Sequence, residues 1–113
     1  MRDLAPTIFR QRLVIEGTRS TLITGDEIVD YLSRLSSVLR MRTIHTPVTH
    51  RSEKFGWAGW IHWETSGAHF YAWERPLPFF SVDIYTCKAF DVRAAVEFTR
   101  EHLRADPVEH KSF

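Results

Sequence analysis

The chain has 113 residues, of which 43% are hydrophobic and 26% charged, and its formal net charge at pH 7 is +1. This length suits one domain with a single core. The near-neutral charge argues against nucleic acid as a partner, because proteins that bind phosphate backbones carry clustered Lys and Arg. There is no run of eighteen apolar residues, so we expect no membrane partner. A single cysteine, Cys87, and an N-terminus without an apolar leader favour the cytoplasm.

The pattern of residues in the N-terminal third of the chain predicts a strand followed by a helix. Alternating apolar residues indicate a half-buried strand from Ile8 to Glu16, which Gly17 ends. Thr24 and Glu27 have the spacing of a capping box, in which the threonine hydroxyl accepts from the backbone N–H of Glu27 while the carboxylate reaches back. The apolar residues that follow recur at helical spacing, so we expect a helix that ends near residue 40.

Four further strands and a second helix are expected after residue 40. The strands span residues 41–49, 57–64, 68–73 and 80–87. Thr65-Ser66-Gly67 makes a tight turn between the second and third of these, which therefore form a hairpin. Asp91 is expected to cap a helix with one apolar side, and the tail from about residue 105 to be loosely ordered.

This order of elements predicts the fold class. Two amphipathic helices and one antiparallel sheet most simply form an α+β two-layer sandwich within a single domain, residues 1–113, with both helices on one face of the sheet. The other face is then open. Aromatic residues make up 13% of the chain and gather on these strands, so we expect either a ligand or a second copy to cover that face. A homodimer or a higher homo-oligomer is the expected assembly.

Several residues lie at fixed offsets from Ser66. They are the pair His50-Arg51 sixteen positions earlier, Gly56, Gly59, Trp73 seven positions later, and the run Val82-Asp83-Ile84-Tyr85-Thr86-Cys87. The bacterial S-adenosylmethionine decarboxylase family has a His-Arg pair, two glycines and a tryptophan at the same offsets. Its run Val-Asp-Val-Phe-Thr-Cys matches residues 82–87, which follow a loop with one extra residue in this chain. The chain resembles that family over nearly its whole length.

The resemblance implies a ligand, a cofactor and several roles. In the family the serine at this place becomes a covalent pyruvoyl group, the cysteine donates a proton and the tryptophan stacks on adenine. Ser66, Cys87 and Trp73 would take these roles in binding and decarboxylating S-adenosylmethionine, a step of polyamine biosynthesis. Without the resemblance, Ser66 would be a turn residue and Cys87 a small buried hydrophobe.

Other working residues of the family are replaced. The family cleaves at Glu-Ser-His, where this chain has Thr65-Ser66-Gly67. Its processing serine corresponds to Ala58, and its processing and catalytic histidine to Tyr71. The phenylalanine that sandwiches adenine with the tryptophan corresponds to Ser52.

Formation of a pyruvoyl group needs proton transfer. The serine hydroxyl must attack the preceding carbonyl and the resulting ester must eliminate, each with the help of an acid or base. Strand alternation places His69 on the same face as Tyr71 and Trp73, so His69 is the candidate substitute base. We therefore expect Ser66, Cys87, Tyr71 and His69 to be catalytic.

A reaction without a pyruvoyl group is the alternative. The sulfonium is a good leaving group, so a site that only positions the ligand could act as a lyase that releases methylthioadenosine. Tyr71, Glu64 and Cys87 would then orient groups or transfer protons, while Glu74 would bind the ribose hydroxyls next to Trp73. A second alternative is a non-catalytic nucleoside-binding or regulatory paralogue subunit.

The expected site holds no metal, because none of the six histidines has the spacing of a ligand pair. We expect the hairpin bend at Ser66, the indole of Trp73 and the thiol of Cys87 to converge around one nucleoside-shaped cavity.

Overall fold

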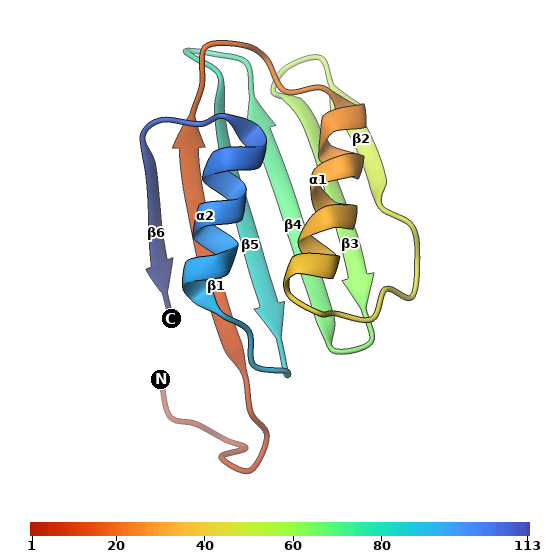
Figure 1. Cartoon of the computed structure of the whole chain (residues 1–113), viewed down its shortest axis with the longest axis vertical. Helices are drawn as coiled ribbons and strands as arrows, with labels where there is room; N and C mark the ends of the chain where they lie inside the picture. The colour runs from red at the N-terminus through yellow and green to blue at the C-terminus, as the bar shows by residue number, and fades with distance from the viewer.

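A computed structural model describes all residues 1–113, and in it two helices cover one face of a six-stranded antiparallel sheet (Figure 1). The strands lie in the order β2-β3-β4-β5-β1-β6. In chain order the elements are β1 (Gln11–Thr18), α1 (Gly25–Val38), β2 (Val48–Ser52), β3 (Gly56–Trp63), β4 (Ser66–Trp73), β5 (Phe79–Thr86), α2 (Val92–Leu103) and β6 (Val108–Ser112).

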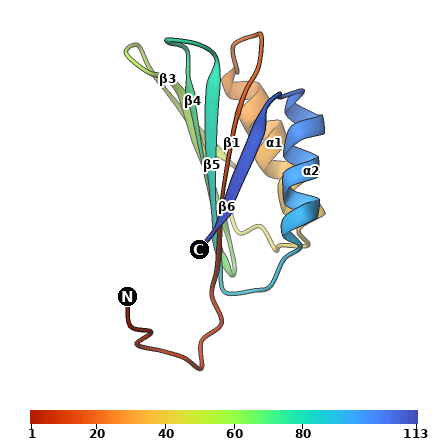
Figure 2. The same cartoon turned by 90° about the vertical axis from the view of Figure 1, so that its left-hand side faces the viewer.

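Figure 2 shows both helices on one side of the sheet and no element on the other. Alternate residues of β4 divide accordingly: Ala68, Phe70 and Ala72 are buried beneath the helices, whereas His69 and Tyr71 on the opposite face are exposed. A single cluster of 21 buried hydrophobic residues fills the space between sheet and helices. The predicted α+β two-layer sandwich is therefore confirmed.

Both helices begin where the sequence predicts. The Thr24 hydroxyl accepts from the N–H of Glu27 at 3.2 Å, and the Glu27 carboxylate accepts from the N–H of Thr24, so the capping box is present. Asp91 caps α2 by accepting from the N–H of Ala94 at 3.1 Å. Neither helix has the length and apolar character needed to span a bilayer.

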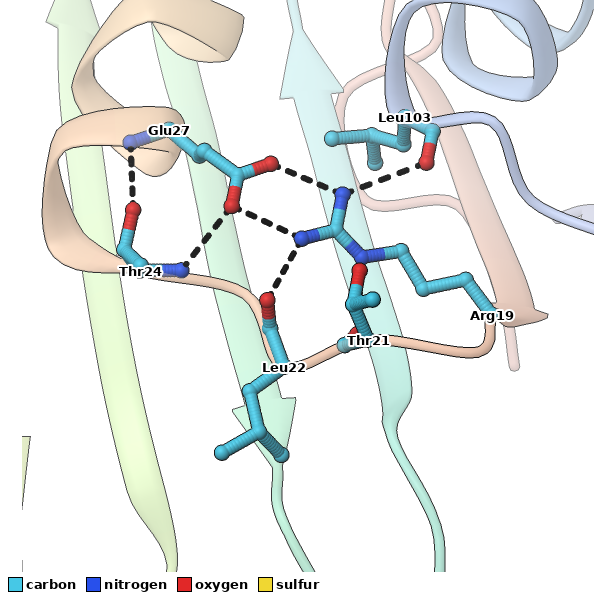
Figure 3. Close-up of polar contacts among 6 residues, drawn as sticks. All are labelled: Arg19, Thr21, Leu22, Thr24, Glu27 and Leu103. Atoms are coloured by element: carbon cyan, nitrogen blue, oxygen red, sulfur yellow. Dashed lines mark hydrogen bonds and ion pairs between the residues drawn. The ribbon is translucent and has the colours of Figure 1, made fainter.

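One arginine joins three segments at one end of the helix layer (Figure 3). The guanidinium of Arg19, which is 9% exposed, donates to both carboxylate oxygens of Glu27 at 2.7 Å. It also donates to the carbonyls of Thr21, Leu22 and Leu103. The loop after β1 is thereby tied to the start of α1 and the end of α2.

Several predicted segments differ. The first strand begins at Gln11 rather than Ile8 and continues through Gly17 to Thr18, and Ser66 and Gly67 belong to β4 rather than to the turn before it.

Residues 41–47 are irregular and form a single β-bridge, between Thr43 and Trp63, so the second strand begins at Val48, just after Pro47. Proline removes a ladder donor, which is consistent with a strand that starts beyond it.

The prediction of a loose tail is wrong. Val108–Ser112 forms β6, which pairs antiparallel with β1 and satisfies backbone groups that would otherwise be an exposed edge. Four of its five residues are exposed, so the segment has no apolar alternation by which the sequence would reveal a strand.

Candidate functional site

Ser66 is the first residue of β4 and has a strained backbone. Its φ is +124°, a region that residues with a side chain rarely adopt. The turn before it consists of Glu64 and Thr65, so Ser66 already pairs with Trp63 on one side and Thr86 on the other. Its hydroxyl makes no hydrogen bond within the chain.

The peptide bond that precedes Ser66 is held from two directions. The carbonyl of Thr65 accepts from the backbone N–H of Cys87 at 2.9 Å. The Thr65 hydroxyl donates to the sulfur of Met41 at 3.3 Å and accepts from the hydroxyl of Thr86 at 3.1 Å. A backbone N–H aimed at a carbonyl oxygen is the arrangement that stabilises negative charge when the carbonyl carbon is attacked.

Ser66 borders a hollow of about 320 Å³, here called the Ser66 hollow. His69 lines it, in agreement with the predicted strand face, and so do two groups that sequence reasoning had not selected, His62 and Asp83. The signal for both is strand pairing and alternation. Asp83 on β5 and Trp60 on β3 pair directly with His69, and His62, two residues after Trp60, lies on the same face.

The charge of Asp83 is balanced by Arg12, which lies outside the Ser66 hollow. Arg12 donates to its two carboxylate oxygens at 3.0 and 2.8 Å, and this hydrogen bonding raises the pKa of Arg12. Neither in this hollow nor elsewhere in the fold are three His, Cys, Asp or Glu side chains grouped closely enough to bind a metal ion.

Tyr71 and Trp73 lie in a second hollow of about 260 Å³, here called the Trp73 hollow. Ser66 and Trp73 are seven residues apart on one strand, which corresponds to roughly 23 Å. Between them the ring centroids of His69 and Tyr71 are 6.2 Å apart, and those of Tyr71 and Trp73 are 6.3 Å apart. The expectation that one cavity within one chain joins Ser66 and Trp73 is therefore wrong.

The remaining predicted residues are more dispersed. Cys87 follows β5 directly, is exposed, and lines neither hollow, although its N–H contacts Thr65. Glu64, in the turn before β4, forms an exposed ion pair with Arg42 at 3.1 Å and also lies outside both hollows.

Glu74 lies beside the Trp73 hollow and is engaged in a contact of its own. Its carboxylate pairs with Arg51 at 3.3 Å, and its side chain is 25% exposed. Neither residue of this ion pair lines the hollow.

Comparison with known proteins agrees with the fold. The structure matches the crystal structure of the adenosylmethionine decarboxylase from Aquifex aeolicus VF5 with a TM-score of 0.76 at 13% identity, over 94% of this chain and 89% of that one. No curated protein matches the sequence. Residues 14–113 match the family model for S-adenosylmethionine decarboxylase. The chain therefore belongs to the S-adenosylmethionine decarboxylase family.

Proposed function

We propose that this chain binds S-adenosylmethionine or a closely related nucleoside and decarboxylates it after Ser66 matures to a pyruvoyl group. Family membership supports the ligand. The reaction is supported above all by the strained backbone of Ser66, next to a carbonyl that accepts a 2.9 Å hydrogen bond from a backbone N–H. These features suit a peptide bond that is cut by its own neighbouring hydroxyl.

In the first step, the hydroxyl oxygen of Ser66 attacks the carbonyl carbon of Thr65. A new C–O bond forms, the C–N bond breaks, and the nitrogen of residue 66 gains a proton. The N–H of Cys87 stabilises the negative oxygen while the carbon is tetrahedral. His69 and His62, which line the hollow beside Ser66, are the groups available to accept the hydroxyl proton.

Elimination then removes the α-proton of residue 66 and breaks its Cβ–O bond, which leaves a carboxylate on Thr65 and a dehydroalanine at residue 66. The imine tautomer of this residue takes up water and releases ammonia, so that residue 66 becomes a pyruvoyl group at the start of a second fragment. A pyruvoyl group supplies a carbonyl that withdraws electrons as a substrate loses its carboxylate. The sulfur of Cys87, exposed beside this position, is the proposed proton donor to the product.

Mass spectrometry of the denatured protein tests the proposal. Maturation yields two fragments, residues 1–65 and 66–113, whereas Ser66→Ala remains one chain. Release of labelled carbon dioxide from carboxyl-labelled S-adenosylmethionine should accompany the cut. An unbroken wild-type chain without such release would overturn the decarboxylase assignment.

The second candidate is a lyase that releases methylthioadenosine without a pyruvoyl group. It is favoured by the absence of a hydrogen-bonded base on the Ser66 hydroxyl and by Tyr71 at the family's histidine position. Tyr71 lines the same hollow as Trp73 and would transfer the proton in this reaction. Glu64 would not, because it is held by Arg42 outside both hollows. Methylthioadenosine production by an unbroken chain would establish it. Calorimetric binding without turnover would instead indicate a non-catalytic or regulatory subunit.

The proposed assembly is a cytoplasmic homodimer that covers the open face of the sheet. The two hollows lie on that face, and Ser66 and Trp73 are roughly 23 Å apart along β4. One ligand would contact both residues where the Ser66 hollow of one copy meets the Trp73 hollow of another. Light scattering should then give at least twice the 13.3 kDa chain mass.

A further inference from the structure

Residues 1–10 precede β1 and form a short segment, here called the N-terminal arm, on the side of the sheet that the helices leave open (Figure 2). The arm and the adjoining strands border a hollow of about 500 Å³, here called the arm hollow. Arg2, Asp3 and Arg10 line it from the arm, and Arg12 and Tyr85 line it from the paired strands β1 and β5. The arm hollow has no residue in common with the Trp73 hollow and only Tyr85 in common with the Ser66 hollow.

Asp3 folds the arm back on itself. Its carboxylate accepts hydrogen bonds from the N–H of Ala5 at 2.9 Å and from the guanidinium of Arg10. These two hydrogen bonds, the one from Ala5 first, lower the pKa of Asp3 and keep its carboxylate charged. Arg10 also donates to the carbonyl of Ala5 at 3.3 Å. Arg2, the neighbour of Asp3, thereby lines the same hollow as Arg10 and Arg12.

Positive charge is in excess around the arm hollow. Arg10 is paired with Asp3, and Arg12 is paired at 2.8 Å with Asp83, which does not line this hollow. Arg2 has no ion-pair partner within the chain. Three arginines and one aspartate line the hollow, so the excess is two positive charges, or one when Asp83 is counted as well.

The three guanidinium groups keep N–H donors that no protein group uses. Arg10 makes its hydrogen bonds through Nη2 alone, and Arg12 makes its two through Nε and Nη2. The Nη1 groups of both therefore remain available, as does the whole guanidinium of Arg2. Donors from three arginines around one hollow are suited to an anion that has several acceptor oxygens.

Arg12 is fixed by a second contact besides its ion pair. Its guanidinium carbon lies 5.1 Å from the ring centroid of Phe113, which also lines the arm hollow. The Nζ of Lys111 is likewise 5.1 Å from that centroid, so a further cation lies beside the hollow. The charge that Arg12 contributes is thus held in place by both Asp83 and Phe113.

We infer that the arm hollow is a binding site for a doubly charged oxyanion of the phosphate class, inorganic phosphate or a phosphate monoester, held by Arg2, Arg10 and Arg12. Guanidinium groups match the oxygens of such an anion, and its two negative charges balance the excess of the lining residues. A single carboxylate has one charge and would leave part of this excess uncompensated. The inference goes beyond the proposed function and does not depend on it, because none of these arginines takes part in the reaction at Ser66.

Calorimetric titration with inorganic phosphate at about pH 8, where the anion is doubly charged, tests the inference. Arg2→Gln should weaken phosphate binding by about 5- to 10-fold, the effect of one charge-assisted contact near the surface. Asp3→Asn keeps the oxygen that accepts from Ala5 but removes the competing charge, so it should strengthen binding. The matched control is Arg34→Gln, which removes an exposed positive charge from α1 on the other side of the sheet and should leave the affinity unchanged.

Two further ligands define the class. Acetate, with one charge, should bind more weakly than phosphate at the same ionic strength. Phenyl phosphate that binds more tightly than inorganic phosphate would identify a monoester as the ligand, and the reverse order would identify the free anion. Equal affinities for acetate and phosphate would overturn the inference.

Other outcomes also contradict it. Wild type that binds no phosphate, or binds it no better than Arg2→Gln, rules the site out. Weaker binding by Asp3→Asn would show that the shape of the arm controls the affinity, and weaker binding by Arg34→Gln that only the net charge of the protein matters. A phosphate-dependent change in light-scattering mass that Arg2→Gln leaves unaltered would indicate a contact between copies instead. Circular dichroism excludes unfolding of the variants.

Discussion

The indole N–H of Trp63 donates a 2.7 Å hydrogen bond to the hydroxyl of Ser36, which in turn donates to the carbonyl of Leu32. All of this lies in the core, where Ser36 is 3% exposed. Ser36→Ala leaves the indole N–H buried without a partner, so we expect the free energy of unfolding to fall by about 1–3 kcal/mol. Urea denaturation measures this loss of stability. The exposed neighbour Ser37 provides the control, because Ser37→Ala should change stability by less than about 0.5 kcal/mol.

The Arg19–Glu27 contact makes stability depend on pH. Hydrogen bonds from Arg19 hold the pKa of Glu27 below its ordinary value of 4.5. A lowered pKa in the folded state means that the contribution is complete above about 4.5 and is lost as the pH falls through the folded-state value. Glu27→Gln should therefore be less stable than wild type at pH 7. The difference should shrink as the pH drops below 4.5, and denaturation curves that stay equally far apart would contradict the assignment.

The strain at Ser66 predicts that replacement by glycine and replacement by alanine have different effects on stability. Glycine adopts positive φ without a steric cost, whereas alanine keeps the strain. We expect Ser66→Gly to be more stable than Ser66→Ala by about 1 kcal/mol in thermal or urea denaturation. Glycine is also favoured over alanine at the next position. Gly67→Ala should be destabilising, because a Cβ there would lie 2.3 Å from the carbonyl oxygen of Ile61.

The histidines of the Ser66 hollow should control maturation. His69→Gln should slow the appearance of the 1–65 and 66–113 fragments by about 10²- to 10⁴-fold if His69 is the base, the usual contribution of a positioned acid or base. His62→Gln tests the other histidine of the hollow, and should slow cleavage to the same extent if His62 is the base instead. His50→Gln, which changes a histidine outside this hollow, should leave the rate of cleavage unchanged. Equal rates for wild type and both hollow variants would exclude histidine as the base.

Local signals predicted most of the fold. The Thr24–Glu27 box and Asp91 define helix starts because capping depends on residues three positions apart. The alternation on β4 correctly placed His69 and Tyr71 on the open face. The tail could not be predicted, since β6 is held by backbone pairing with β1 and its side chains are exposed.

The site was less predictable for a related reason. Alternation tells which face a side chain occupies, but not what lies between two residues on that face, so Ser66 and Trp73 were expected to meet. Phe55, which lines the Trp73 hollow, lies in the turn between β2 and β3, where no periodic pattern exists. Its backbone is held by the Ser52 hydroxyl of β2 and by the N–H of Glu74, just beyond β4.

The strand order has a consequence for the matured protein. A cut before Ser66 leaves β1, β2 and β3 on one piece and β4, β5 and β6 on the other. Because β1 lies between β5 and β6, the pieces interleave, and three strand boundaries join them: β3–β4, β5–β1 and β1–β6. The nicked polypeptides thus share a single sheet, and separating them requires that the sheet itself be dismantled.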